Sequence, residues 1–134
     1  MIRFVPTICP YCGVGCGLLL VVKDGRVVDT QPMAGHPVSE GKLCIKGWNA
    51  HQFIHHPERL TRPLIRENGG FRESSWEEAI GLVAKRLEET KGKSGPDSIA
   101  FLSSARCTNE ENYLLQKLVR AVIGTNNIDH CARL

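Results

Sequence analysis

The sequence carries six cysteines, and the spacing of four of them suits metal chemistry. Cys9, Cys12 and Cys16 lie within eight consecutive residues, and Cys44 follows after an intervening stretch of 27 residues. Four thiolates that converge on one site can hold a tetrahedral zinc ion or an iron–sulfur cluster. The remaining two, Cys107 and Cys131, stand alone in the sequence. A metal centre near the N-terminus is therefore the first prediction.

The arrangement of the four thiols discriminates between the two kinds of metal centre. Structural zinc sites usually combine two ligand pairs, whereas here three ligands share one loop and the fourth is distant. The loop also contains Gly13, Gly15 and Gly17, which permit tight curvature and bring backbone N–H groups near cluster sulfurs. The spacing favours a [4Fe–4S] cluster over zinc, with unligated thiols as the third alternative. It differs from the common ferredoxin spacings, which argues against a simple ferredoxin.

Length and composition describe the protein that must carry this centre. The chain has 134 residues, 42% of them hydrophobic and 23% charged, which is typical of a globular chain with one or two small domains. Its longest apolar run, residues 18–22, is far shorter than the roughly 20 residues of a membrane helix. The net charge of +3 is too small to indicate a nucleic-acid binder. With no signal peptide ahead of the cysteines, we expect a cytoplasmic protein whose thiols bind metal.

The first part of the sequence predicts a small antiparallel β unit that presents the cysteine loop. Residues 2–8, 18–22 and 26–30 read as strands, and Asp24-Gly25 between the last two is a strong hairpin signal. A loop rich in proline and glycine then returns the chain to Cys44. We assign residues 1–58 to this cluster-binding domain.

The second part, residues 59–134, predicts the incomplete start of an α/β domain. A short hairpin is expected over residues 63–71, followed by a helix over 76–90 that either Ser74 with Glu77 or Ser75 with Glu78 would cap. A buried strand over 98–103, a helix that starts near Thr108 and a strand from residue 127 complete the pattern. The order helix, strand, helix, strand indicates a parallel α/β layer, so the fold class is α/β (α+β overall).

Several ordered motifs resemble one enzyme superfamily, the molybdopterin oxidoreductases. The resemblance begins with residues 9–16 and 40–47 around the four cysteines and continues through residues 60–66 and 75–79. It covers the chain from about residue 2 to residue 134. Within the superfamily the chain is most similar to the catalytic (alpha) subunit of formate dehydrogenases, with assimilatory and periplasmic nitrate reductases second.

The resemblance implies roles for individual residues. Cys9, Cys12, Cys16 and Cys44 would ligate the cluster.

Lys46 matches a lysine that lies between the cluster and a pterin of the molybdenum cofactor. Arg106 and Cys131 stand where nitrate reductases place Gln and Asn against that cofactor, which weakens the nitrate-reductase alternative. As an alternative to a cofactor role, Cys131, like Cys107, can be a small buried hydrophobic residue.

The resemblance also implies where the reaction takes place. In formate dehydrogenases a segment similar to residues 127–134 directly precedes the metal ligand, a cysteine or selenocysteine, so we expect that ligand immediately after Leu134. Our hypothesis is that a UGA codon for selenocysteine was read as a stop. On this interpretation the present chain holds no catalytic residue and does not oxidise formate by itself.

The function implied for the full-length enzyme is formate oxidation to carbon dioxide at molybdenum or tungsten held by bis-molybdopterin guanine dinucleotide. Electrons would leave through the cluster to an iron–sulfur or flavin subunit or to another carrier. Two alternatives stay open: another molybdopterin enzyme such as a nitrate reductase, or a small iron–sulfur carrier or zinc-stabilised interaction module without catalysis.

Overall fold

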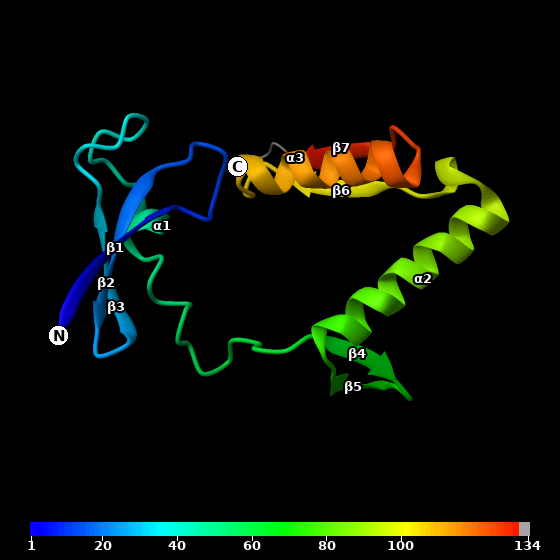
Figure 1. Cartoon of the computed structure of the whole chain (residues 1–134), viewed down its shortest axis with the longest axis horizontal. Coiled ribbons are helices and arrows are strands. Elements are labelled where there is room, and N and C mark those ends of the chain that lie inside the picture. Colours follow the sequence, from blue (N-terminus) through cyan, green and yellow to red (C-terminus); the bar gives the residue numbers. More distant parts are fainter. Residues whose placement is uncertain (132–134) are drawn as a thin grey trace. The chain divides into compact units, whose positions relative to one another are not determined.

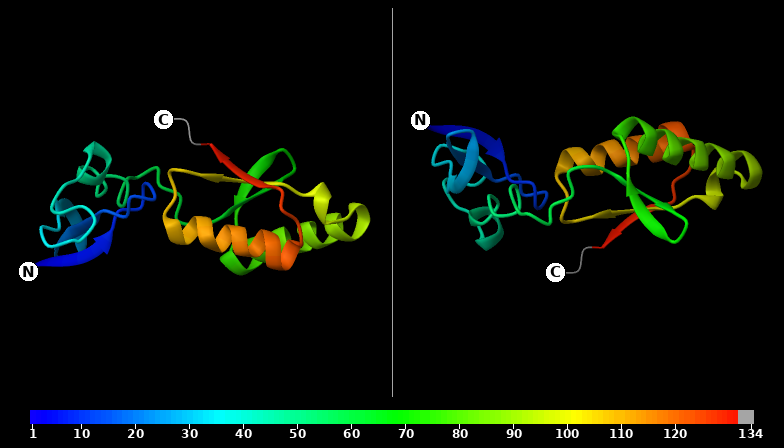
Figure 2. Two further views of the ribbon diagram at one scale, coloured as in Figure 1. Left: turned by 90° about the horizontal axis from the view of Figure 1, so that it is seen from above. Right: turned by 90° about the horizontal axis from the view of Figure 1, so that it is seen from below.

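The computed structural model describes residues 1–131 and arranges them as two compact units (Figures 1 and 2). The first unit contains residues 1–59, residues 103–114 and the described end of the chain from His130. The second contains residues 60–102 and 115–129. Within residues 1–131, none of the helices combines the length and hydrophobicity that crossing a lipid bilayer requires.

The first unit is built on a three-stranded antiparallel sheet. Its strands are β1 (Ile2–Ile8), β2 (Gly17–Lys23) and β3 (Arg26–Pro32), with β2 in the centre. Asp24 and Gly25 both have positive φ, 48° and 80°, as a two-residue hairpin turn of the favoured type requires. The hairpin predicted from Asp24-Gly25 is confirmed.

The register of this sheet sets the position of the cysteine loop. Ile8 pairs with Gly17 at the end of the β1–β2 ladder, so residues 9–16 form the loop that joins the two strands. Cys9, at the start of the loop, is buried in a small core together with Leu18 and Ala50. The short helix α1 (Ile45–Trp48) follows Cys44 directly. The loop is thus anchored by a paired sheet on one side and by packed apolar side chains on the other.

The second unit begins with a hairpin and a long helix. Strands β4 (Leu64–Glu67) and β5 (Gly70–Glu73) pair in the antiparallel sense, as the sequence predicts. Helix α2 spans Trp76–Ser94 and therefore runs four residues beyond the predicted end at residue 90. It continues through Gly92 and ends at Gly95, whose φ of 82° cannot continue a right-handed helix. The short 3-10 helix η1 (Pro96–Ser98) follows.

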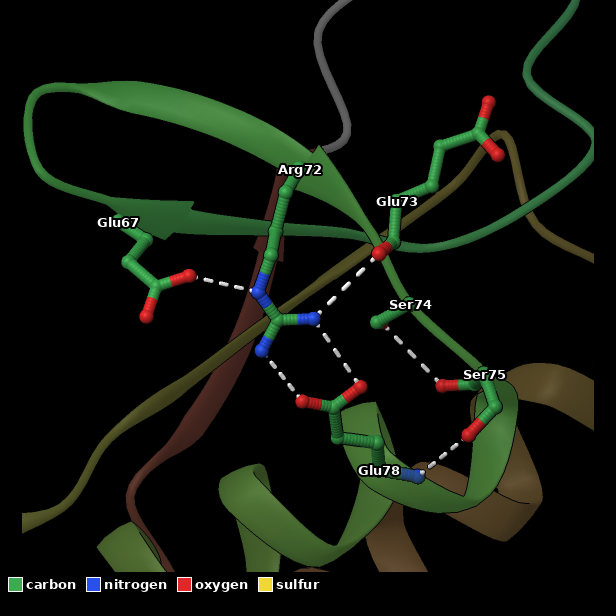
Figure 3. A network of polar contacts seen from close by, with 6 residues as sticks. All are labelled: Glu67, Arg72, Glu73, Ser74, Ser75 and Glu78. Atoms are coloured by element: carbon green, nitrogen blue, oxygen red, sulfur yellow. Dashed lines mark hydrogen bonds and ion pairs between the residues drawn. The ribbon is translucent and has the colours of Figure 1, made fainter.

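The start of α2 is fixed by a network of polar side chains (Figure 3). The hydroxyl of Ser75 accepts a hydrogen bond from the backbone N–H of Glu78 at 3.1 Å, so Ser75 rather than Ser74 is the N-cap. Arg72 donates to Glu67 at 2.6 Å and to Glu78 at 3.2 Å. Hydrogen bonds from Arg72 hold the pKa of the Glu78 carboxyl below its usual range. The same pairing raises the pKa of Arg72.

The rest of the chain has the predicted order of strand, helix and strand. It comprises β6 (Phe101–Ser104), α3 (Asn109–Lys117), the π-helical turn η2 (Leu118–Ile123) and β7 (Ile128–Cys131). Strands β6 and β7 pair with each other, and their arrows point the same way in Figure 1. This parallel pair, joined by a helix, is the βαβ connection expected of an α/β layer. The predicted fold class, a small antiparallel β domain followed by the start of an α/β domain, is confirmed.

Candidate metal centre

The four clustered cysteines line one cavity of about 280 Å³ in the first unit. Cys9, Cys12 and Cys16 come from the loop between β1 and β2, and Cys44 precedes α1. All four are free thiols. The structure therefore brings together the four residues whose spacing predicted a metal centre.

The cavity and its donors fit a polynuclear cluster. A water molecule in the liquid occupies about 30 Å³, so the space exceeds what a single ion fills. The thiols surround the space from two segments of chain. Sulfur donors of this kind suit iron–sulfur clusters.

The thiols differ in their access to solvent. Cys9 is buried, Cys12 and Cys16 are half-buried, and Cys44 is exposed. Burial raises the pKa of the Cys9 thiol, and the nearby Cys16, Cys12 and Cys44 raise it further, while a hydrogen bond with the backbone of Tyr11 lowers it. The four thiols lie close enough for their thiolates to repel one another, and a positively charged metal centre would relieve this repulsion.

Backbone hydrogen bonds and close packing hold the cysteine loop in shape. The N–H of Cys9 donates to the carbonyl oxygen of Cys16 at 2.8 Å and closes the base of the loop. The N–H of Gly17 donates to the buried hydroxyl of Ser39 at 3.2 Å. A side chain at position 17 would overlap the ring of His36, so only glycine fits there. His36 and Ser39, which precede Cys44 in the sequence, thus help to shape the loop that carries the other three thiols.

Two histidines hold the segment that follows Cys44 and α1 against the sheet. The hydroxyl of Thr30, which is fully buried on β3, lies 3.2 Å from Nδ1 of His51. Farther along, the N–H of Val27 donates to Nε2 of His55 at 3.0 Å. These contacts tie residues 51–55 to β3 and so restrict where Cys44 can lie.

The remaining predicted site residues divide between the cavity and its surroundings. Lys46 and Arg106 both line the cavity with the four thiols. Cys131 does not line it and is exposed at the end of β7, and Cys107 is half-buried. The metal ligand expected immediately after Leu134 is not among the 134 residues of the sequence, so that prediction stays untested.

Sequence reasoning named only Arg106 from one wall of the cavity. Ala105 lines it beside Arg106, and both come from the loop between β6 and α3. That loop is joined to the cysteine loop by a hydrogen bond from Asn109 to the carbonyl oxygen of Gly13. Almost one hundred residues separate these partners, and neither residue type carries a metal-site signal. The family resemblance at Arg106 and the motif that marks the start of α3 were the two signals that pointed to this region.

Two family models together match nearly the whole chain. The model of the Molybdopterin oxidoreductase Fe4S4 domain matches residues 2–56, and the model named Molybdopterin oxidoreductase matches residues 59–134.

Curated relatives add detail. The F420-dependent formate dehydrogenase 2 subunit alpha of Methanococcus maripaludis is 56% identical over 132 residues. The F420-dependent formate dehydrogenase subunit alpha of Methanocaldococcus jannaschii is 58% identical over 132 residues. Each alignment covers 98% of this chain but 19% of the relative, so the chain spans about a fifth of the length of these proteins.

A solved structure shares the fold. Acetylene hydratase from Pelobacter acetylenicus matches with a TM-score of 0.70 and 24% sequence identity, covering 93% of this chain and 18% of that one. At this level of identity the match concerns the fold alone.

Proposed function

The chain belongs to the molybdopterin oxidoreductase family, and from this premise we propose that it is the N-terminal, cluster-binding and first cofactor-binding part of a formate dehydrogenase alpha subunit. The resemblance found in the sequence is confirmed by the family matches. The observation that carries the proposal is the convergence of four cysteines on one cavity in a chain that is 56% and 58% identical to formate dehydrogenase alpha subunits.

We assign the cluster ligands to Cys9, Cys12, Cys16 and Cys44. The matched Fe4S4 domain supports a [4Fe–4S] cluster, and these are the cysteines that share the cavity. Such a cluster supplies one-electron transfer when bound. The protein contributes a half-buried pocket that limits access of water, together with a loop whose shape is set by hydrogen bonds. The proposed domain boundary lies between residues 58 and 59, in the gap between the two family matches.

Lys46 and Arg106 give the cavity its positive charge. A cluster held by four thiolates carries net negative charge, so two cations in the lining of the cavity stabilise it and its reduced state most of all. We propose that Lys46 links the cluster to a pterin of the cofactor and that Arg106 contacts the same cofactor. Cys131 is proposed as a further cofactor contact on sequence position alone, because it lies outside the cavity lining.

The reaction proposed for the whole protein is oxidation of formate to carbon dioxide with release of two electrons and a proton. The molybdopterin cofactor, with molybdenum or tungsten and a guanine dinucleotide, supplies the redox chemistry when bound. Electrons then pass through the cluster to a partner subunit or carrier. The relatives are named as F420-dependent, which makes F420 the first acceptor to test. A cytoplasmic location and a selenocysteine as metal ligand stay predictions, the second of which is tested by reading the gene beyond the codon for Leu134.

The decisive experiment combines metal analysis with turnover in the complete protein that carries this chain. Iron and acid-labile sulfide in equal amounts, with an electron paramagnetic resonance signal after reduction, are expected together with formate-dependent reduction of F420. Cys44→Ser should remove the signal and the turnover, whereas Cys107→Ser, outside the cavity lining, serves as the control. Zinc in place of iron would contradict the cluster, and nitrate turnover without formate turnover would contradict the substrate.

A further inference from the structure

A single side chain from the start of α3 binds the backbone of the cysteine loop. The amide Nδ2 of Asn109 donates a hydrogen bond to the carbonyl oxygen of Gly13 at 2.7 Å, and both residues belong to the first compact unit. Gly13 directly follows Cys12 in the loop. In Figure 1 the cysteine loop lies next to the chain segment that leads into α3. The contact therefore acts one residue away from a proposed cluster ligand.

The identity of residue 13 provides a second observation. A Cβ atom at Gly13 would lie 2.8 Å from Oδ1 of Asn109, closer than real Cβ contacts. Gly13 is not among the residues with positive φ, so the backbone conformation by itself does not demand glycine. The space that a side chain would need is filled by the Asn109 amide. Gly13 and Asn109 are thus matched to each other.

Hydrogen bonds between neighbouring residues brace the segment of chain that carries Asn109. Thr108 and Glu111 form a capping box, in which the Thr108 hydroxyl accepts from the N–H of Glu111 at 3.2 Å and the Glu111 carboxylate accepts from the N–H of Thr108 at 2.7 Å. Asn112 donates to the carbonyl oxygens of Ser104 and Thr108 at 3.1 and 3.2 Å. The β6–α3 loop is therefore braced by its own hydrogen bonds, in addition to the hydrogen bond from Asn109 to the cysteine loop.

The braced loop also forms part of the cavity. Ala105 and Arg106 line the space between the four thiols. The hydrogen bond from Asn109 to Gly13 joins this wall to the segment between Cys12 and Cys16. Loss of the bond would free the wall and the loop to separate, which would admit water to the thiols. Solvent exposure and local geometry are among the properties that set the potential of an iron–sulfur cluster.

We propose that Asn109 is a positioning residue of the cluster site, which fixes the bend between Cys12 and Cys16 and keeps the β6–α3 loop closed over it. The inference rests on the proposed function, because it assigns the loop to cluster binding. Asn109 itself supplies no ligand. It acts through the backbone of Gly13 and therefore through the position of Cys12.

The test uses the complete protein with five substitutions. Asn109→Ala removes the amide, Asn109→Asp keeps its size but removes the donor, and Asn109→Gln keeps a donor on a longer side chain. Asn126→Ala, an exposed residue of the second unit, is the matched control. Gly13→Ala tests the other side of the contact, since the added methyl group must displace the Asn109 amide.

The first measurement is hydrogen–deuterium exchange of the peptide that spans residues 9–17 in metal-free protein. Asn109→Ala and Asn109→Asp should speed this exchange by about two- to tenfold, the factor that corresponds to the net contribution of one hydrogen bond. Asn109→Gln should restore part of the protection, and Asn126→Ala should match the wild type. Equal exchange in Asn109→Ala and the control would overturn the inference.

The second measurement is the reduction potential of the loaded cluster. Water stabilises the more highly charged reduced state, so Asn109→Ala should raise the potential and speed bleaching of the cluster in air, with Asn109→Gln in between. Asn109→Asp serves only the exchange experiment, because its added negative charge by itself lowers the potential. An unchanged potential would restrict Asn109 to a purely structural role and reject it as a positioning residue. If wild-type protein holds no iron and sulfide, the proposed function fails, and the exchange experiment still decides whether Asn109 holds the loop.

Discussion

At the scale of single residues, the chemistry of the site follows from thiols that differ in environment while sharing one space. Cys9 is buried at 5% exposure at the start of the loop, whereas Cys44 is exposed. Neighbouring thiolates repel one another, so together they favour a centre with positive charge at their middle. Because each ligand completes the coordination of the cluster, loss of one affects the whole centre.

The first prediction concerns the four proposed ligands. Serine in place of any one of them should abolish the broad visible absorbance of the cluster, because a hydroxyl is a poor substitute for a thiolate ligand. Cys107→Ser and Cys131→Ser should leave the absorbance intact, since neither lines the cavity. Absorbance spectra of the purified variants measure this directly. Full absorbance in Cys44→Ser would contradict the four-ligand assignment.

The second prediction concerns the charge of Lys46. Replacement by glutamine removes a cation from the cavity wall, which destabilises the more negative reduced cluster. The potential should fall by on the order of tens of millivolts, equivalent to roughly 1 kcal/mol for one electron. Lys42→Gln is the control, because Lys42 is exposed beside Glu40 and does not line the cavity. A redox titration that gives the same shift for both variants would refute a specific role for Lys46.

At the scale of elements, α2 shows how local side chains fix a helix start. Two serine–glutamate pairs in the sequence satisfied the capping pattern, and the structure selects Ser75 with Glu78. The Glu78 carboxylate turns to Arg72 on β5 instead of closing a reciprocal capping box. The hairpin and the helix are thereby joined by charged groups at the surface.

The third prediction is that Ser75→Ala lowers the free energy of unfolding by about 1 kcal/mol, the usual effect of losing an N-cap side chain. The backbone N–H of Glu78 loses its acceptor and must turn to water. Ser94→Ala, at the other end of α2, should change stability much less. Urea unfolding of both variants provides the comparison, and similar losses in the two would show that capping is unimportant here.

The fourth prediction concerns pH. The folded-state pKa of Glu78 lies below its usual value, so its pairing with Arg72 stabilises the fold above the unfolded pKa. That contribution should disappear as pH falls through the folded pKa of Glu78. The effect is small because both side chains are well exposed to solvent. Thermal unfolding of wild type and Glu78→Gln should differ at neutral pH and converge in acid; a constant difference would count against this pairing.

At the scale of the whole molecule, the chain leaves large apolar side chains uncovered. Ile80, Val83, Leu114 and Val122 are each about 60% exposed on the helices. Exposed apolar side chains of this kind promote association in an isolated chain. The chain matches 19% of the length of its formate dehydrogenase relatives, in which much more protein is available to pack.

The fifth prediction is that residues 1–134 expressed alone associate and bind an apolar dye strongly. Val83→Ser with Leu114→Ser should reduce dye binding, because these side chains account for part of the exposed apolar surface. Lys85→Ser, which replaces a polar residue on the same helix as Val83, is the control. Size-exclusion chromatography that shows a compact monomer with no dye binding would contradict the expectation.

The sequence by itself determined the features that depend on neighbouring residues or on short motifs. The Asp24-Gly25 turn, the capped start of α2 and the order of elements after residue 98 were all predictable, because turns, caps and hydrophobic periodicity are local. The convergence of the four cysteines was also predictable from their spacing, because it requires only one loop and a chain segment that returns to the sheet at Cys44. The end of α2 was not predictable to the residue, because Gly92 is tolerated within the helix.

Only the tertiary structure decided which distant residues complete the cavity. Ala105 and Arg106, the second of which the family resemblance had already singled out, come from a loop about sixty residues beyond Cys44, and no local pattern indicates where a loop so far along the chain will pack. The tertiary structure likewise shows that Cys131 does not line the cavity and that Asn109 is hydrogen-bonded to Gly13. Contacts of this range depend on how complete elements fold against one another, which local sequence does not encode. The thiols thus identified the chemistry of the site, and the fold supplied its walls.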